Sequence, residues 1–467
     1  MPTPADYDTP ATGATLWRGD RPVSDQGENV CVIGAGASGL CAVKNLREQG
    51  FGVDCYERET GVGGAWNWRH DRSPVYATTH LVSSKPFSQY PDFPMPDSWP
   101  DYPHHGQVLA YLERYADHFE LRRHIWFGTE VVRVEPADGG RWDVTTRSAG
   151  GSGAERTQRY AAVVVANGHN WSPRMPEYEG LSDFTGQVIH ASAYHDATQL
   201  RGRRVLVVGG GNTGCDIAVE AAQQAVRCWH STRRGYWYPP KFLFGRPLDQ
   251  IHARAVALRL PLRLRQWIFH LVLRLTVGDL TRFGLPVPDH RMYETHPIVN
   301  SQLVYYAGHG ALIPVPDVAR FRRHSVELVD GREIDPDLVV LATGYQPRFE
   351  FLDGQLLDAG ADGRPQLYLH AFARNRPTLA VVGLLEADSG IFPLVHWQSV
   401  AIARWLRTRL ADPAAAAVLQ ARIDSEAGAS WHEADVADSP RHWFEVSHLT
   451  YLRALQSTLD SLEVPAR

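Results

Sequence analysis

The chain contains a short apolar run that leads through glycines into an amphipathic stretch. NVCVIG begins at residue 29 and is followed by GAGASG and LCAVKNLREQG, which ends at Gly50. A continuous apolar run indicates a buried strand, and apolar residues spaced by three and four indicate a helix. GVDCYE (52–57) has the pattern of a second strand. This order predicts a βαβ unit, the start of a doubly wound parallel sheet.

The same order of elements returns near the middle of the chain. A strand, a turn, a helix and the next strand are predicted for RVLVVG (204–209), GGNTG (210–214), CDIAVEAAQQAV (215–226) and VRCWHS (226–231). Each unit is followed, after a long interval, by an apolar strand ending in small residues: AAVVVANGH (161–169) and DLVVLATGY (337–345). The fold class that follows is α/β, with two Rossmann-like dinucleotide-binding domains.

Three further segments precede or interrupt this duplicated pattern. Residues 1–28 are rich in Pro, Asp, Thr and Gly without any period, so we expect an irregular N-terminal extension. Alternating apolar and polar residues between 129 and 160 predict a small β-meander. We assign 29–168 and 337–467 to the first domain. Residues 169–336 form a second domain inserted into it, with its own Arg- and Leu-rich insertion at about 239–300.

The first glycine-rich turn has the GxGxxG spacing of a dinucleotide-binding loop. Gly34 allows the sharp turn, Gly36 lets a pyrophosphate approach the backbone, and Gly39 lets helix and strand pack closely. The helix N-terminus, near Ser38, directs unpaired N–H groups at phosphates. Glu57 ends the next strand, 23 residues after Gly34. A carboxylate at that place accepts hydrogen bonds from both hydroxyls of a ribose, so this segment predicts a dinucleotide site.

The second glycine-rich turn has the same form but a different strand end. Its glycines and the following helix start are Gly209, Gly211, Asn212, Thr213 and Gly214. No acid stands at the ribose place; Ser231, Thr232 and Arg233 stand there instead. Hydroxyl groups followed by arginine suit a 2′-phosphate, because guanidinium binds phosphate in a bidentate way. This strand end favours NADPH over NADH, the alternative being a solvated basic turn.

Several further segments resemble the flavin-containing monooxygenases, close relatives of the Baeyer–Villiger monooxygenases. The matching segments are Gly63-Gly64-Ala65-Trp66 (GGxW), YPDFP (90–94), residues 184–194 (FxGxxxHxxxY) and Ala342-Thr343-Gly344-Tyr345. The resemblance spans about residues 30–405. Tyr194 at the last place of the FxGxxxHxxxY fingerprint favours a flavin-containing monooxygenase, whereas Trp there would favour a Baeyer–Villiger enzyme.

The resemblance implies an FAD- and NADPH-dependent monooxygenase that acts through a C4a-(hydro)peroxyflavin. Its partners would be O₂ and a small organic substrate, taken to an N- or S-oxide or, for a ketone, to a Baeyer–Villiger product. FAD belongs to the first loop and NADPH to the second. By the same resemblance Gly64, Trp66, Thr343 and Gly344 belong to the cofactor-binding residues.

Three residues are candidates for catalysis. His190 and Tyr194 belong to the fingerprint, although packing between the domains explains that fingerprint equally well. The chain departs from the better-known branch at Val82, where that branch has an Asn two residues before Ser-Lys. Val cannot donate a hydrogen bond. His80 is the nearest polar substitute, and its alternative interpretation is a histidine of a surface loop.

Composition excludes several classes of partner and enzyme. A net charge of −5 over 467 residues does not indicate a nucleic-acid surface. Five cysteines without a CxxC pair suit a reducing compartment and argue against a disulfide reductase, which needs a redox-active pair. Without a signal-like N-terminus or an apolar run of about 18 residues, we expect a cytoplasmic protein with no integral membrane segment. The alternatives are a non-oxygenating two-dinucleotide flavoprotein reductase and a redox-sensing flavoprotein.

The Arg-rich insertion allows three interpretations. Residues 253–278 mix five arginines with Leu, Trp and Phe, a pattern that permits a basic amphipathic helix on a membrane interface. We favour a lid over the active site or a contact between subunits, with arginine stems lying over apolar surface. An oligomer and a peripheral membrane association therefore both stay open, and no metal site is expected.

Overall fold

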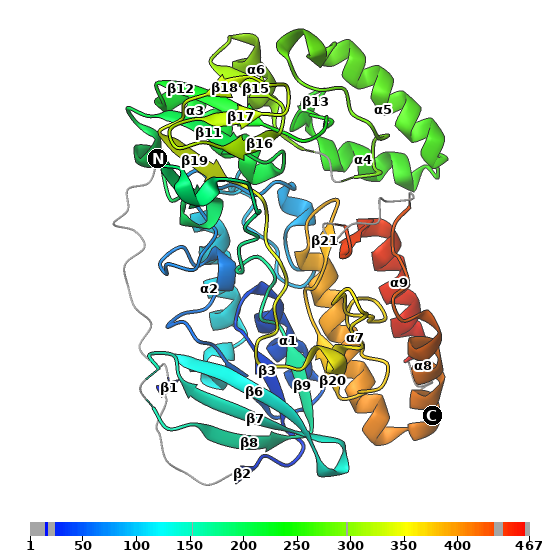
Figure 1. The fold of residues 1–467 in the computed structure, drawn as a ribbon. Coiled ribbons are helices and arrows are strands. Elements are labelled where there is room, and N and C mark those ends of the chain that lie inside the picture. Colours follow the sequence, from blue (N-terminus) through cyan, green and yellow to red (C-terminus); the bar gives the residue numbers. More distant parts are fainter. Residues whose placement is uncertain (1–14, 17–23, 152, 296–297, 434–441, 463–467) are drawn as a thin grey trace.

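The computed structural model describes residues 15–16, 24–151, 153–295, 298–433 and 442–462. Two parallel sheets occupy opposite ends of the molecule (Figure 1), the first at the bottom of the view and the second at the top. Each sheet has helices on one face and a smaller, largely antiparallel sheet on the other. The predicted α/β class with two Rossmann-like units is therefore confirmed.

The first sheet is built around the first glycine-rich loop. Its strands, all parallel, follow the order β1 (Thr15–Leu16), β5 (Ile125–Phe127), β4 (Val53–Tyr56), β3 (Val30–Ile33), β9 (Ala162–Val165) and β20 (Leu379–Val381). Val30 and Val32 pack with the helices, whereas Cys31 and Ile33 pack against the antiparallel sheet. Burial on both faces explains why β3 reads as an unbroken apolar run.

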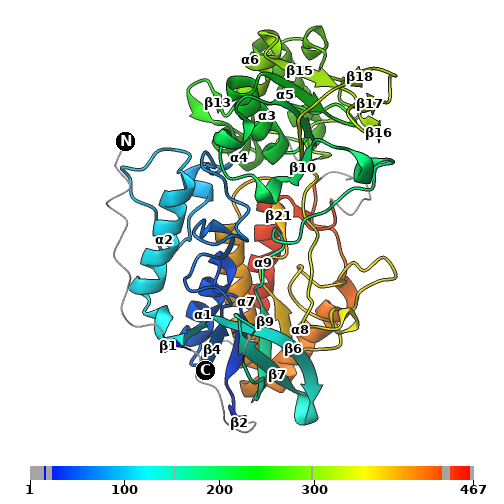
Figure 2. The same ribbon diagram turned by 60° about the vertical axis from the view of Figure 1, so that its left-hand side comes forward.

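Helices and the predicted meander cover the two faces of this sheet. The helical face carries α1 (Ala37–Glu48), α2 (His105–His118), α7 (Phe392–Ala411), α8 (Pro413–Glu426) and α9 (His448–Ser461). The other face carries β2 (Ser24–Asp25), β8 (Arg156–Tyr160), β7 (Arg141–Ser148) and β6 (Thr129–Ala137). Figure 2 shows α2 beside α1 and the meander at the far end from the second sheet. A short pair, β21 (Glu386–Ala387) and β22 (Glu445–Val446), joins the segments before α7 and α9.

The second sheet repeats this layering. Its parallel strands follow the order β10 (Gln187–His190), β19 (Leu338–Leu341), β11 (Arg204–Val208), β12 (Arg227–Ser231) and β15 (Leu312–Val315). One face is covered by α3 (Asn212–Gln224) and α6 (Ser301–Gly308), the other by β16 (Val318–Phe321), β17 (Val326–Leu328) and β18 (Glu333–Ile334). Short 3₁₀ turns connect the elements: Gly64–Trp66, Lys85–Phe87, Leu121–His124, Asp138–Gly140, Leu181–Asp183, Ala191–Ala193, Ala197–Leu200, Leu280–Phe283 and Gly354–Leu357.

The predicted domain boundary at residue 337 needs correction. β19 (Leu338–Leu341) pairs with β10 and β11, so the second domain extends at least to residue 341. A four-residue apolar strand buried on both faces fits either sheet by its pattern alone, and only its pairing partners decide. Of the extension predicted for residues 1–28, only 15–16 and 24–28 are described, and they include β1 and β2. The rest lies outside the described residues.

The insertion at 239–300 forms two helices rather than one. A hairpin of β13 (Phe242–Leu243) and β14 (Arg246–Pro247) leads into α4 (Leu248–Ala257), and α5 (Leu262–Thr276) follows. Between the two helices, Arg259 has a φ of +54° and Pro261 precedes the first residue of α5, so the two segments cannot form one continuous helix. None of the helices in the described ranges has the length and hydropathy needed to cross a bilayer. All five cysteines are free and buried.

Candidate active site

One large cavity connects the two dinucleotide loops. Its volume is about 1690 Å³, and Gly34 of the first loop and Gly209 of the second both line it. These loops follow the carboxyl ends of β3 and β11, where open parallel sheets bind their ligands. The cavity also reaches the GGxW segment, the 343–345 linker, the insertion and the segment before α7.

Most of the predicted site residues lie on this cavity. They are Gly34, Gly36, Ser38, Glu57, Gly64, Trp66, His80, His190, Gly209, Gly211, Asn212, Thr213, Ser231, Arg233, Thr343 and Gly344. Four predicted residues do not line it: Gly39, Tyr194, Gly214 and Thr232. Gly39 and Gly214 were predicted to act through packing, so their position off the cavity is the expected one. Tyr194 was predicted to be catalytic and Thr232 to bind a cofactor, and neither side chain lines the cavity.

The first loop requires its glycines for steric reasons that the structure makes explicit. Gly34 has φ of +100°, a left-handed conformation that favours glycine. A Cβ on Gly39 would lie 1.8 Å from the carbonyl oxygen of Gly34. A Cβ on Gly64 would lie 2.8 Å from Cα of Gly36, so the GGxW segment presses against the loop. The bare backbone of the loop and the N-terminus of α1 therefore form a cradle that fits a pyrophosphate.

Glu57 stands at the end of β4, beside this cradle. The side chain is buried and lines the cavity, and its two oxygens accept hydrogen bonds from the backbone N–H groups of Ala35 (2.6 Å) and Glu59 (2.9 Å). Burial raises the pKa of Glu57, and the two N–H groups oppose that rise. Each carboxylate oxygen keeps a second lone pair, so the geometry leaves acceptors for a ribose.

The second loop reproduces the first closely. Gly209 has φ of +131°, and a Cβ there would lie 2.1 Å from the carbonyl oxygen of Ala342. A Cβ on Gly214 would lie 2.1 Å from the carbonyl oxygen of Gly209. The linker that begins at Ala342 thus lies directly against the loop, and α3 directs its N-terminus at the cavity through Asn212 and Thr213.

The strand end after the second loop differs from the prediction in one respect. Arg233 is exposed and lines the cavity, as a 2′-phosphate ligand must. Ser231 also lines it, but its hydroxyl donates a hydrogen bond to the carbonyl oxygen of Pro316 at 2.8 Å. Thr232 is buried away from the cavity. Alternation along the strand turns Thr232 to the opposite face, which leaves Arg233 as the principal candidate.

His190 links the fingerprint strand to the second linker. Its Nδ1 accepts a hydrogen bond from the backbone N–H of Ser192 (3.1 Å), and its Nε2 donates to the carbonyl oxygen of Gly344 (3.1 Å). Burial lowers the pKa of His190, which keeps the ring neutral. Both ring nitrogens are therefore occupied by the backbone, an arrangement that fits the domain-packing interpretation of the fingerprint better than a catalytic one.

Tyr194, also predicted to be catalytic, is buried outside the cavity. Its hydroxyl donates a hydrogen bond to Glu220 on α3, and Glu220 also accepts one from the hydroxyl of Thr78. The hydroxyl of Tyr76 donates to Asp216, one helical turn earlier, at 3.0 Å. These contacts attach residues 76–79 to the second domain. Tyr194 therefore positions the segment that leads to His80 and does not face the cavity.

His80 lies on the cavity with one side of its ring fixed. Its Nδ1 donates to the carbonyl oxygen of Thr78 at 2.7 Å, and the ring of His104 stands 5.0 Å away. Burial lowers the pKa of His80, and the charge of His104 lowers it further. The ring is therefore neutral at neutral pH, with a lone pair on Nε2. Val82, at the place of the family's Asn, also lines the cavity.

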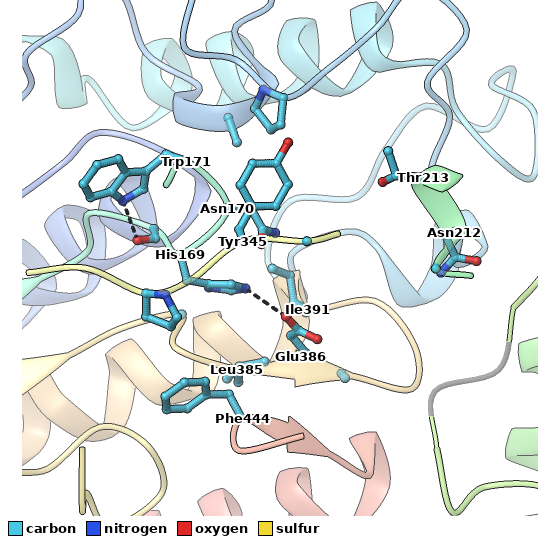
Figure 3. Close-up of a pocket in the computed structure, with 18 of the residues that line it drawn as sticks. His169, Asn170, Trp171, Asn212, Thr213, Tyr345, Leu385, Glu386, Ile391 and Phe444 are labelled. Atoms are coloured by element: carbon cyan, nitrogen blue, oxygen red, sulfur yellow. Dashed lines mark hydrogen bonds and ion pairs between the residues drawn. The ribbon is translucent and has the colours of Figure 1, made fainter. Parts of the chain in front are cut away.

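Several cavity residues escaped the sequence prediction. Figure 3 shows His169, Trp171, Tyr345, Glu386 and Phe444 around one part of the cavity. His169 Nε2 lies 3.9 Å from Glu386 Oε1, and the Trp171 indole donates to the carbonyl oxygen of Gly168 at 3.1 Å. The start of α7 could have been predicted from the sequence, because Gly390, Phe392 and a proline stand in this order at the beginning of an apolar run. Nothing local connects Phe444 with the other cavity residues.

The insertion supplies another wall of the cavity. Leu248, Asp249, His252, Val256, Phe269 and Tyr293 line it from α4, α5 and the segment that follows. Asp249 accepts a hydrogen bond from the backbone N–H of Ser84 at 2.6 Å, which ties α4 to the segment after His80. The lid interpretation of the insertion requires such a position.

Comparison with known proteins places these features in one family. The family model described as flavin-binding monooxygenase-like matches residues 27–461. Dimethylaniline monooxygenase (N-oxide-forming) 2 of Mus musculus is 33% identical over 396 residues, covering 81% of this chain and 72% of the relative. Flavin-containing monooxygenase 5 of Homo sapiens is 32% identical over 405 residues, with the same coverage.

Solved structures share the fold at lower identity. The flavin-containing monooxygenase of Stenotrophomonas maltophilia has a TM-score of 0.62 at 24% identity, covering 83% of this chain and 100% of that one. An open crystal structure of cyclohexanone monooxygenase has a TM-score of 0.64 at 22% identity, covering 84% and 89%. Both are built on the same arrangement of two dinucleotide-binding units.

Proposed function

Because the chain belongs to the flavin-binding monooxygenase family, we propose that it uses NADPH and O₂ to place one oxygen atom on a small organic substrate. The observation that carries this proposal is that both glycine-rich loops line one cavity. A flavin on the first loop and a nicotinamide on the second would meet there.

Family membership confirms the predicted class of enzyme, a flavoprotein monooxygenase among the oxidoreductases, with FAD and NADPH as cofactors. It favours oxygenation over the two alternatives, a flavoprotein reductase and a redox sensor. A cytoplasmic location stays a prediction.

The first loop would hold FAD. The pyrophosphate would lie over the bare backbone at Gly36, at the N-terminus of α1, and the ribose would bind Glu57. Trp66, in the turn that presses against the loop, borders the same cavity. When bound, the flavin supplies the activation of O₂, and the chain excludes water from it.

The second loop would hold NADPH. The N-terminus of α3 faces its pyrophosphate, and Arg233 faces its 2′-phosphate. Thr343 and Gly344 border the same space, and His190 fixes them through the carbonyl of Gly344. These residues would hold a nicotinamide that would supply hydride, and the exposed Arg233 suits a cofactor that is exchanged in each cycle.

His80 would set whether the activated oxygen is protonated, and this protonation decides between heteroatom and ketone oxygenation. With Nδ1 held by Thr78, Nε2 is free to accept a proton or a hydrogen bond at the cavity wall. When the activated oxygen is protonated, it is electrophilic and reacts with soft amines and sulfides. When it is deprotonated, it is nucleophilic and attacks the carbonyl group of ketones. One relative is named for N-oxide formation, and one neighbour in structure is named for cyclohexanone. We propose N- or S-oxygenation as the main activity, with measurable ketone oxygenation.

A substrate panel tests this proposal. A tertiary amine, an alkyl aryl sulfide and a cyclic ketone are each incubated with enzyme, NADPH and O₂, and product is counted per NADPH consumed. We expect N-oxide or sulfoxide as the main product and a smaller yield of lactone. NADPH consumption that yields only hydrogen peroxide with every substrate would contradict the proposal.

A further inference from the structure

Helix α5 (Leu262–Thr276) turns its apolar residues outward. We call the apolar stripe the set Leu264, Trp267, Ile268, Leu271 and Leu275, whose exposed fractions lie between 39% and 76%. The spacing i, i+3, i+4, i+7, i+11 places all five on one face. Figure 1 shows α5 at the outer edge of the molecule, beyond α4. An exposed apolar helix face at the outer edge of the molecule is a candidate interaction surface.

Polar contacts on the inner face fix this orientation. Arg265 is buried and donates to the carbonyl oxygen of Leu260 at 3.1 Å and to Glu433. Gln266 is also buried and donates to the carbonyl oxygen of Met292 at 2.9 Å. Two polar residues of the helix therefore face the inside of the protein. No rotation of α5 can bury the apolar stripe without breaking these bonds.

A basic row runs along one edge of the apolar stripe. Arg263, His270 and Arg274 stand at i, i+7 and i+11, and all three are exposed. At about 100° per residue, they fall along the same side of the stripe. The sequence from 251 to 278 contains no Asp or Glu. Within the described part of the chain, Arg263 and Arg274 form no ion pair.

We propose that the apolar stripe of α5 docks in the interface of an anionic lipid bilayer, with Arg263 and Arg274 on lipid phosphates. An apolar face with an adjacent basic row is the pattern of helices that lie in the headgroup region. Arginine stems reach over apolar surface while the charged ends stay with phosphate. Phe269 of the same helix lines the cavity, so docking brings the cavity within about one helix diameter, roughly 10 Å, of the bilayer.

A second copy of the chain fits the apolar stripe less well. Fifteen residues make a helix about 22 Å long, and a stripe about 10 Å wide covers roughly 220 Å². Stable subunit interfaces need about 800 Å² from each partner. Antiparallel two-fold pairing of α5 would also bring the basic row of one copy close to that of the other, whereas an anionic bilayer neutralises it.

Vesicle flotation with the full-length, flavin-loaded protein tests the proposal. Vesicles of phosphatidylcholine alone are compared with vesicles that also contain phosphatidylglycerol, at low and high salt. We expect binding to the anionic vesicles and loss of binding at high salt. Ile268→Gln with Leu271→Gln should abolish it. Arg263→Gln with Arg274→Gln should weaken it about 25-fold, because each interfacial charge contributes about a fivefold change in affinity.

Matched controls separate this surface from general effects. Val418→Gln on α8 removes another exposed apolar residue, and Arg407→Gln on α7 removes another exposed arginine. Both should bind vesicles like the wild type. The residues changed on α5 do not line the cavity, so NADPH oxidation should be unchanged in every variant and reports correct folding.

Three results would overturn the proposal. The wild type could fail to float with anionic vesicles. It could bind both kinds of vesicle equally, which would remove the role of the basic row. In light scattering the wild type could be a dimer that Ile268→Gln with Leu271→Gln converts to a monomer, which would make the apolar stripe a subunit contact.

Discussion

The two dinucleotide sites share one loop geometry and differ at the end of the following strand. Gly34 and Gly209 both have positive φ, and Gly39 and Gly214 both pack against the first glycine of their loop. The first strand end carries the buried acid Glu57, fixed by two backbone N–H groups. The second carries exposed Arg233.

This difference separates two tasks. A buried carboxylate, fixed before the ligand arrives, binds a ribose without losing side-chain freedom, which favours a permanently held cofactor. An exposed arginine offers a charge-assisted contact to a phosphate while its side chain stays mobile, which favours exchange. Under the proposed function, the loop would provide dinucleotide binding in general, and the strand end would select the cofactor and its residence time.

Breaking each loop in turn should have the largest effect. Gly39→Ala places a Cβ 1.8 Å from the carbonyl oxygen of Gly34, and Gly214→Ala places one 2.1 Å from that of Gly209. Overpacking a rigid site costs about 1–3 kcal/mol or more, so binding should fall roughly a hundredfold at the altered loop. Gly39→Ala should lose FAD, whereas Gly214→Ala should stay yellow and lose reduction by NADPH. Flavin absorbance and stopped-flow reduction measure the two outcomes.

Gly50→Ala serves as the control. Apart from its neighbours in the chain, no atom lies within 4 Å of the added Cβ, so the substitution causes no steric clash with either glycine-rich loop. Like the other two variants it replaces a glycine, and its φ of +82° strains the new side chain. A Gly214→Ala protein that lost its flavin while keeping NADPH binding would invert the assignment of the two loops.

Removing Arg233 should sharpen the comparison at the second site. Loss of a charge-assisted phosphate contact is worth about 1.5–3 kcal/mol, or roughly 10- to 150-fold. Arg233→Ala should raise the Michaelis constant for NADPH by that factor and leave the constant for NADH nearly unchanged. Arg323→Ala, an exposed arginine away from the cavity, is the matched control. Equal effects on both cofactors would show that Arg233 does not face the 2′-phosphate.

A smaller effect is expected at His80, which lines the cavity that both loops share. Loss of one hydrogen bond changes a step by roughly 2- to 12-fold, so His80→Ala should raise hydrogen peroxide release per NADPH by that factor. The pKa of His80 is lowered from 6.5, so the ring is neutral above pH 6.5 and becomes charged only at lower pH. Wild-type coupling should therefore be constant above pH 6.5 and change below it. The variant should lack that change; identical profiles would make His80 a loop residue.

The smallest effect concerns the second sheet alone. Hydrogen bonds from Arg204 lower the pKa of Asp337 from 3.8 to about 2, so the stability this pair contributes is present above pH 3.8 and is lost as pH falls toward 2. Both side chains are partly exposed, which limits the contribution to about 1 kcal/mol. Asp337→Asn should lower stability in urea at neutral pH and match the wild type more closely below pH 3.8. A constant difference at every pH would exclude this ionic contribution.

Local patterns predicted the parts of the fold that are specified locally. β3, α1, β11 and α3 lie where apolar runs and glycines placed them. The packing of Gly39 against Gly34 also follows from their spacing, because the two residues belong to the same turn, whereas the atoms nearest an added Cβ on Gly34 belong to the distant Ala166. A sharp turn requires glycine, and glycine is visible in the sequence.

Long-range pairing is what the sequence could not specify. β19 has an apolar pattern that fits either sheet, and only its bonds to β10 and β11 assign it to the second. The place of Thr232 and Tyr194 off the cavity depends on strand alternation and on Glu220, 26 residues from Tyr194. Phe444 reaches the cavity through the pairing of β22 with β21, which no local pattern encodes.

The central claim is that two cofactors in one cavity transfer a single oxygen atom to substrate. Incubation with NADPH, a sulfide substrate and ¹⁸O₂, followed by mass spectrometry of the product, measures it directly, and the cofactor released by heat is identified by chromatography. The account predicts one ¹⁸O atom in the sulfoxide for each NADPH consumed, and FAD as the released flavin. A product without the label, or FMN alone as the released flavin, would contradict it.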